Sequence, residues 1–88
     1  MKPIDKNKTF KKHYKARITP NPKFVKQFDE RVRAFVLGKR DRPLDDHSLG
    51  GDKLGLRAFL ITGDIRVVYR ETTEEYIFLD VGTHNQVY

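Results

Sequence analysis

The stretch from Ile65 to Tyr88, IRVVYRETTEEYIFLDVGTHNQVY, decides the fold that the sequence predicts. It contains two segments rich in β-branched and aromatic residues, at 65–70 and 76–81, with a polar turn between them. This composition favours strands, and the short turn makes the two strands antiparallel. The tail that follows carries the imidazole of His84 and the phenol of Tyr88. Polar side chains held at the end of a buried strand are a common way to build a site, so this tail is the first candidate for function.

Two amphipathic helices are predicted in the N-terminal half. In the first, which follows residue 7, aromatic residues recur at helical spacing and Thr9 is the candidate N-cap. Prolines 20 and 22 separate the two helices, because the residue before a proline is pushed out of the helical region. Asn21 is the expected N-cap of the second helix, and Gly38 is expected to close it. Its apolar stripe consists of Phe24, Phe28, Val32 and Phe35, widened by Val25, Val36 and Leu37.

The remaining segments complete one domain spanning residues 1–88. Residues 56–62 have the composition of a third strand, and Ile4 indicates a short edge strand near the N-terminus. Residues 41–53 are rich in Pro, Asp and Gly and are predicted to be a loop. The predicted fold class is therefore α+β, with a short N-terminal strand, a two-helix hairpin and an antiparallel β-meander.

Charge is distributed unevenly along the chain. The net charge is +6, but residues 1–43 hold 14 Lys and Arg against four Asp and Glu, whereas residues 44–88 hold four against eight. A basic half of this strength is typical of proteins that bind a nucleic acid or an acidic protein. Basic charge that serves solubility alone is the alternative.

Composition also excludes several classes of protein. The chain has no cysteine, which rules out disulfides and thiolate metal sites, and its three histidines are scattered. No Gly-rich loop opens a helix, so we expect no nucleotide cradle, no cofactor and no metal. No apolar run could span a bilayer and no secretory signal is recognisable, so we expect no membrane partner and a cytoplasmic location.

The polar residues that remain suit metal-free cleavage of RNA. The chain has no cysteine, and Ser48 does not lie in a nucleophile-elbow motif, so no nucleophile is evident. In RNA cleavage the 2′-hydroxyl of the substrate is itself the nucleophile, and the protein supplies a base, an acid and a cation near the phosphate. Histidine suits the proton transfers and arginine suits the phosphate. The candidates are His47, Arg57, Asp64, Arg66, His84 and Tyr88.

Each of these candidates has a purely structural alternative. His84 could cap the strand end, and His47 could anchor its loop by a hydrogen bond. Asp64 suits a hairpin turn after glycine. The alternatives for the other three are a cross-sheet ion pair for Arg57, a water-facing position for Arg66 and a frayed terminus for Tyr88.

The order of the elements and several motifs resemble the RelE/ParE superfamily of toxins from bacterial toxin–antitoxin pairs. The most similar branch is that of the YafQ-like ribosome-dependent mRNA endonucleases. His47-Ser48-Leu49 followed by Gly51 is similar to the branch's His-Pro-Leu-x-Gly, and Gly55-Leu56-Arg57 resembles its Gly-Tyr-Arg. The ending Gly82-Thr83-His84, with Tyr88, resembles its Gly-Thr-His and closing Phe. The resemblance runs from about Phe10 to Tyr88, with its motifs confined to residues 47–88.

The resemblance implies roles for individual residues. His47, Asp64 and His84 would take part in acid–base chemistry or in positioning RNA. Tyr88 would contact the substrate, and we expect Arg57 and Lys53 to bind the substrate too.

The chain departs from the YafQ branch at two positions. Leu60 stands where that branch has a second sheet histidine, and Ile65 stands where it has tryptophan. Arg66, in contrast, occupies the position of a functional arginine in the RelE and YoeB branches. We therefore expect a mixed site in which Arg66 is the cation that meets the phosphate.

The implied function is that of the toxin of a type II toxin–antitoxin system. It would be a ribosome-dependent mRNA endoribonuclease that blocks translation, with ribosomal RNA contacted through the basic helical half. Its expected protein partner is an acidic or amphipathic antitoxin that folds on binding. Two alternatives remain: a ParE-like inhibitor of DNA gyrase without nuclease activity, and an RNA-binding relative whose active site has eroded at Leu60 and Ile65.

Overall fold

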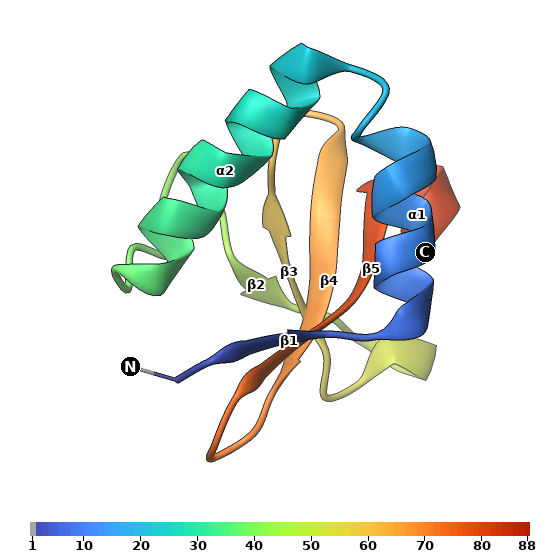
Figure 1. The fold of residues 1–88 in the computed structure, drawn as a ribbon. Helices are drawn as coiled ribbons and strands as arrows, with labels where there is room; N and C mark the ends of the chain where they lie inside the picture. Colours follow the sequence, from blue (N-terminus) through green and yellow to red (C-terminus); the bar gives the residue numbers. More distant parts are fainter. Residues whose placement is uncertain (1) are drawn as a thin grey trace.

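Two helices cover one face of a mixed β-sheet (Figure 1) in the computed structural model, which describes residues 2–88. The elements are β1 (Ile4–Lys6), α1 (Lys8–Arg17), α2 (Pro22–Val36), β2 (His47–Ser48), the 3₁₀ turn η1 (Gly51–Lys53), β3 (Arg57–Leu60), β4 (Ile65–Glu71), β5 (Tyr76–Thr83) and α3 (His84–Val87). The strand order is β1-β5-β4-β3-β2, in which β1 runs parallel to β5 and the other neighbours are antiparallel. The predicted α+β fold class, with its N-terminal strand, two helices and meander, is confirmed.

The ends of both long helices are set by side-chain caps. Asn21 caps α2 as predicted, since its side chain accepts a hydrogen bond of 3.0 Å from the backbone N–H of Lys23. The prediction of Thr9 as the cap of α1 is wrong. Asn7 holds that position, and its Oδ1 accepts a hydrogen bond of 2.7 Å from the N–H of Phe10. Asn7 ends β1 in an extended conformation, which places its side chain over the first turn of the helix.

The main core lies between the two long helices and the sheet. Phe35 of α2 stacks on Phe59 of β3, with 4.7 Å between ring centroids, and meets Tyr69 of β4 edge-on. Phe10 of α1 packs on Phe78 of β5. The predicted stripe of α2 thus faces the sheet, but its extension to Leu37 is wrong. Leu37 is 64% exposed, because the helix ends at Val36 and the chain turns away from the sheet.

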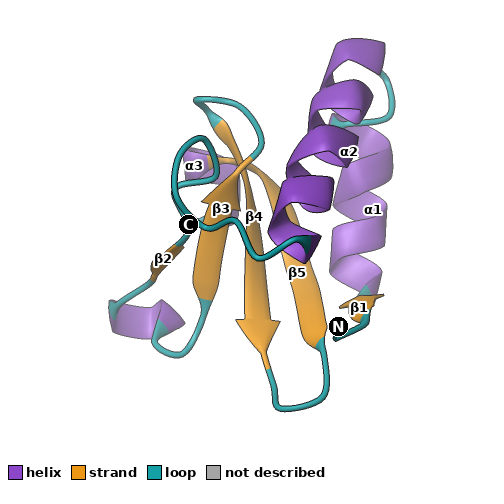
Figure 2. Cartoon of the chain, turned by 90° about the vertical axis from the view of Figure 1, so that its left-hand side faces the viewer, coloured by secondary structure: helices purple, strands orange, loops and turns teal. Residues whose placement is uncertain are grey.

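The opposite face of the sheet carries α3 and a second, smaller cluster (Figure 2). Val87 of α3 packs on Ala58 and Val68, with Leu49 and Leu56 partly buried around them. The tail after β5 forms a short helix over His84–Val87. The prediction of 41–53 as a loop is wrong at β2 and η1, where the backbone is regular. Among residues 2–88, no helix combines the length and apolar composition that crossing a membrane requires.

Candidate functional site

Arg66 lies near the start of β4 and faces the α3 side of the sheet. Its neighbours in the strand, Ile65 and Val67, are buried in the main core under the helices. Because successive side chains of a strand point to opposite faces, Arg66 points away from that core. Its cross-strand partners are Leu60 on β3 and Gly82 on β5.

The short helix α3 brings the tail back over Arg66. The guanidinium carbon of Arg66 lies 5.4 Å from the centroid of the Tyr88 ring. The Tyr88 ring in turn meets the His84 ring edge-on, with 4.6 Å between centroids. Arg66, His84 and Tyr88, three of the predicted site residues, therefore form one continuous group.

One atom of this group is buried without a partner. Nε of Arg66 is shielded from solvent and has no hydrogen-bond partner within residues 2–88. A buried donor left unpaired costs about 1–3 kcal/mol, and an acceptor supplied by a ligand would recover that cost. Nε of Arg66 is therefore a donor that no other described residue of the chain engages.

Gly82 permits the close approach of α3 to the strand end. A Cβ atom at this position would lie 2.6 Å from Oε1 of Gln86 and 2.7 Å from a guanidinium nitrogen of Arg17. Gln86 uses that oxygen to accept a hydrogen bond of 2.8 Å from the N–H of Thr83, which caps α3. Arg17 reaches over from α1 and donates to the backbone oxygen of Val81. The glycine of the Gly-Thr-His motif therefore has a packing reason, because it lets both side chains fix the start of α3.

His47 lies on the same face as Arg66 but two strands away. It pairs with Ala58, whose side chain packs under α3, and paired residues share a face. Two strand spacings amount to roughly 10 Å. Nδ1 of His47 lies 2.9 Å from the backbone oxygen of Asp45, which can only accept a hydrogen bond. Nδ1 therefore donates, and Nε2 holds the free lone pair of the neutral ring.

Asp64 lies in the exposed turn between β3 and β4. The next residue, Ile65, pairs with Thr83, so Asp64 and His84 lie at the same end of the sheet. The backbone N–H of Asp64 donates to Oγ1 of Thr62 over 3.1 Å, a turn contact that matches the structural alternative. Within residues 2–88, the Asp64 carboxylate forms no hydrogen bond or ion pair with the Arg66 group.

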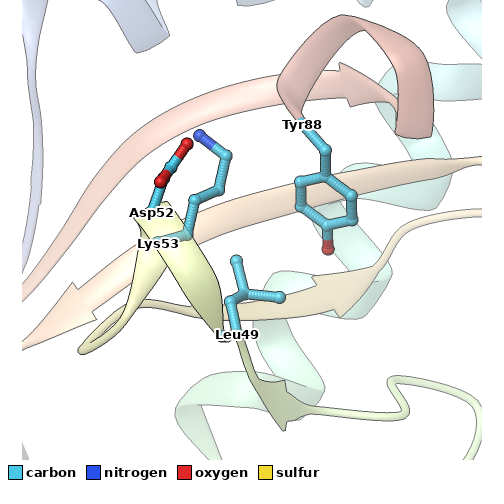
Figure 3. Close-up of a pocket in the computed structure, with 5 residues that line it drawn as sticks. Leu49, Asp52, Lys53 and Tyr88 are labelled. Atoms are coloured by element: carbon cyan, nitrogen blue, oxygen red, sulfur yellow. The ribbon is translucent and has the colours of Figure 1, made fainter.

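A hollow of about 360 Å³ opens beside Tyr88 (Figure 3). It is lined by Leu49, Gly50, Asp52, Lys53 and Tyr88. The Tyr88 ring stands on one side, and the side chains of Asp52 and Lys53 stand on the other. Lys53 thus lies across the hollow from Tyr88, and both residues are predicted to bind the substrate. Asp52 is not among the residues predicted from the sequence, where its only signal is its position beside Lys53.

Arg57 is separated from this group by the sheet itself. Its Nε and a terminal nitrogen bind Oδ1 of Asp46 at 2.7 and 2.6 Å, and the hydroxyl of Tyr69 donates to the other oxygen of Asp46. The Asp46 side chain is fully buried. Its hydrogen bond raises the pKa of Arg57, while burial and then the same carboxylate raise the pKa of Tyr69. Arg57 therefore forms the ion pair that its purely structural role predicts. We call the contacts of Arg57 and Tyr69 with Asp46 the Asp46 clamp, and it fixes the segment just before His47.

Sequence comparison decides between the families that this fold serves. Residues 2–88 match the protein family described as the bacterial toxin of type II toxin–antitoxin system, YafQ. The chain belongs to this family. It is therefore a toxin of the YafQ type, as the motifs in 47–88 predicted. Among curated proteins, no sequence match is found.

Solved structures of similar fold agree with the YafQ assignment. The E. coli DinJ-YafQ complex contains a chain with a TM-score of 0.81 and 19% identity, covering 100% of this chain and 99% of that chain. A metal-bound toxin from Helicobacter pylori gives 0.82 and 22%, with both chains fully covered. A YoeB/ParE toxin from Agrobacterium tumefaciens gives 0.76 and 19%, covering 96% of this chain and 99% of that chain. These similarities establish the RelE/ParE-like fold.

Proposed function

We propose that this YafQ-family toxin is a ribosome-dependent mRNA endoribonuclease that blocks translation. The observation that carries the proposal is the group of Arg66, Tyr88 and His84 on one face, with 5.4 Å and 4.6 Å between successive members. A guanidinium, an aromatic ring and an imidazole are the groups needed to hold a phosphate, stack a base and transfer a proton.

Arg66 is assigned to the scissile phosphate. Its planar fork donates parallel hydrogen bonds to phosphate oxygens, and its charge offsets the negative charge that grows during attack. Arg66 forms no ion pair or side-chain hydrogen bond within residues 2–88, so its charge is not committed to another residue, which supports this role. Tyr88 lies against the guanidinium and keeps it oriented.

The histidines are assigned to the two proton transfers. The 2′-oxygen forms a bond to phosphorus while the bond from phosphorus to the 5′-oxygen breaks. One imidazole accepts the 2′ proton, and another acid donates a proton to the departing 5′-oxygen. His84 contacts the Tyr88 ring, His47 shares the face of the sheet that carries Arg66, and Nε2 of His47 has the free lone pair that a base needs. The products would be a 2′,3′-cyclic phosphate and a 5′-hydroxyl end.

The helical layer is proposed to bind both of the toxin's macromolecular partners. Exposed basic residues of α1 and α2 would contact ribosomal RNA through its phosphates. The related E. coli toxin was solved with DinJ, and we infer that this chain also has a cognate antitoxin. Two adjoining hollows of about 370 and 440 Å³ lie beside the helices and suit an acidic amphipathic segment. Their lining residues are Lys6, Phe10, Lys11, Tyr14, Phe28, Asp29, Val32, Arg33, Val36 and Leu37.

A ParE-like inhibitor of gyrase is the competing function, because the same fold serves both activities. A direct test incubates purified toxin with translating ribosomes and, separately, with DNA gyrase and relaxed plasmid. We expect cut mRNA and unimpaired supercoiling, with cutting lost in His84→Ala. Blocked supercoiling with intact mRNA would replace the proposal with the gyrase function. Intact mRNA on toxin-loaded ribosomes, with gyrase unaffected, would indicate a toxin that binds RNA without cutting it.

A further inference from the structure

The hollow beside Tyr88 contains an acidic side chain that the proposed cleavage does not use. Asp52 lies on η1, is exposed, and forms no hydrogen bond or ion pair with any part of the chain from residue 2 onward. Figure 3 shows its side chain next to that of Lys53, across the hollow from Tyr88. A free carboxylate in a site for a polyanion needs a reason, because it repels phosphate.

The chemistry of a carboxylate restricts what can bind at this wall. An ionised carboxylate only accepts hydrogen bonds, so it excludes a phosphate and favours a neutral group with N–H donors. In RNA such donors lie on the edges of the bases. Lys53, the next residue, can meet the phosphate that follows the base. The hollow therefore has separate places for a base edge and for a backbone phosphate.

The other walls suit the face of a base. The Tyr88 ring is 40% exposed, which leaves part of its surface free for stacking, and Leu49 adds an apolar contact. A volume of about 360 Å³ lies within the range of small-ligand sites, and the glycine backbone at Gly50 leaves its rim open. A nucleotide base can enter with its face on Tyr88 and its edge toward Asp52.

Among the four bases, guanine complements a carboxylate best. Its N1–H and N2–H donors are adjacent and parallel, so both oxygens of one carboxylate can accept from it at once. Adenine and cytosine each offer one amino group beside an acceptor nitrogen. Uracil offers one N–H between two carbonyl oxygens, which a carboxylate repels. We propose that the hollow lined by Leu49, Gly50, Asp52, Lys53 and Tyr88 is a nucleobase-binding pocket in which Asp52 selects guanine next to the cut. This proposal rests on the proposed nuclease function.

A purely structural role for Asp52 predicts a different outcome. An acidic residue in the first turn of η1 interacts favourably with the unpaired N–H groups there. In that case removal of the charge would weaken the turn slightly and leave base preference unchanged. Asp52→Asn distinguishes the two roles, because the new amide pairs one acceptor and one donor, the pattern that complements adenine and cytosine.

The first experiment measures binding without catalysis. Guanosine 5′-monophosphate and uridine 5′-monophosphate are titrated into the full chain and followed by NMR at Leu49 and Tyr88. We expect at least about tenfold tighter binding of the guanosine nucleotide to the wild type and loss of this difference in Asp52→Asn. The control is Glu74→Gln, which removes one negative charge from the turn between β4 and β5, outside the lining of the hollow, and should retain the preference. Equal binding of both nucleotides, or a preference that survives Asp52→Asn, would overturn the proposal.

The second experiment maps cleavage on translating ribosomes for the same three proteins. We expect guanine at one fixed position beside the cut in the wild type and a shift toward adenine or cytosine in Asp52→Asn. Cleavage with the same base preference in the wild type and in Asp52→Asn would reject the nucleobase-binding pocket but not the nuclease function. Absence of cleavage by all three proteins would reject the nuclease function. The nucleotide titrations would then be the test of the nucleobase-binding pocket.

Discussion

Arg66 is the residue on which the account of the site depends most. In the sequence, Arg66 alternates with Ile65 and Val67, which predicts that its side chain points away from the core, as the structure shows. The same alternation is compatible with a side chain that simply faces water. What the sequence could not give was the return of Tyr88 over the guanidinium, because that contact depends on α3. The burial of Nε depends on the same tertiary contacts, so local sequence carries no signal for it.

Replacement of Arg66 with glutamine should abolish most of the activity. The loss of one charged donor from a phosphate site typically costs about 100-fold in rate, so we expect a loss of that order in single-turnover cleavage of mRNA on ribosomes. Arg70→Gln is the matched control, since Arg70 lies on the same strand and is exposed. Equal rates for both variants would remove Arg66 from the chemistry.

Gly82→Ala should disturb α3 specifically. The added Cβ would lie 2.6 Å from Oε1 of Gln86, so the cap of α3 has to move. This atom is the end of a flexible side chain, so the expected cost is that of the disturbed cap, about 1 kcal/mol, which denaturant unfolding measures. Gly63→Ala is the control, because its Cβ would meet nothing within 4 Å, and it should unfold like the wild type. If both variants have the wild-type free energy of unfolding, the packing reason for Gly82 is wrong.

At the scale of the elements, the sequence predicted the two long helices, the N-terminal strand and the three strands of the meander, and missed β2, η1 and α3. The stripe of α2 and the β-branched runs of β4 and β5 carry their own periodic signal. The four residues of α3 carry none, and so short a helix is unstable alone. It exists because Val87 is buried on Ala58 and Val68. Such contacts depend on the completed sheet and cannot be read from local sequence.

The two-residue strand β2 has a similar cause. Its sequence has the composition of a loop, and β2 becomes a strand by pairing with Arg57 and Ala58 of β3. Just before it, the buried Asp46 carboxylate is clamped by Arg57 and Tyr69. In sequence, Asp46 is one of several acidic residues in a polar loop, so its role could not be distinguished from solvation. The expectation that Arg57 binds substrate remains untested, but its geometry favours the clamp.

The clamp predicts how stability depends on alkaline pH. Burial and Asp46 raise the pKa of Tyr69 in the folded chain above that of an unfolded tyrosine, which is about 10. The neutral phenol therefore contributes stability that is complete below about pH 10 and is lost as the pH rises further. In denaturant unfolding at stepped pH, Tyr69→Phe should be less stable than the wild type near neutrality and should decline less above pH 10. Parallel decline of the two proteins would contradict the clamp.

At the scale of the molecule, the uneven charge of the sequence becomes a division between two layers. The basic N-terminal half forms the helical layer, and the more acidic half forms most of the sheet, with the candidate site on the face away from α1 and α2. Family and fold were predictable because motifs such as Gly82-Thr83-His84 keep their order along the chain. The two hollows beside α1 and α2 could not be predicted from the sequence, since their shape depends on the angle between the two helices.

Leu37→Glu should weaken binding of the cognate antitoxin without affecting cleavage. Leu37 is 64% exposed and lines the larger hollow of the helical layer, so a charge there would oppose an apolar and acidic segment. We expect a loss of about tenfold or more in affinity by calorimetry. Leu54→Glu, which changes an exposed leucine outside the two hollows, is the matched control. Unchanged affinity in Leu37→Glu would place the antitoxin elsewhere.

The central claim is that the Arg66, Tyr88 and His84 group promotes attack by the 2′-hydroxyl of the mRNA. The most direct test programs ribosomes with an mRNA that carries a single 2′-deoxynucleotide immediately before the mapped cut. We predict that the toxin cuts the all-ribose message to leave a 2′,3′-cyclic phosphate and does not cut the deoxy-substituted message at that position. Cleavage of both messages at equal rates would contradict the account.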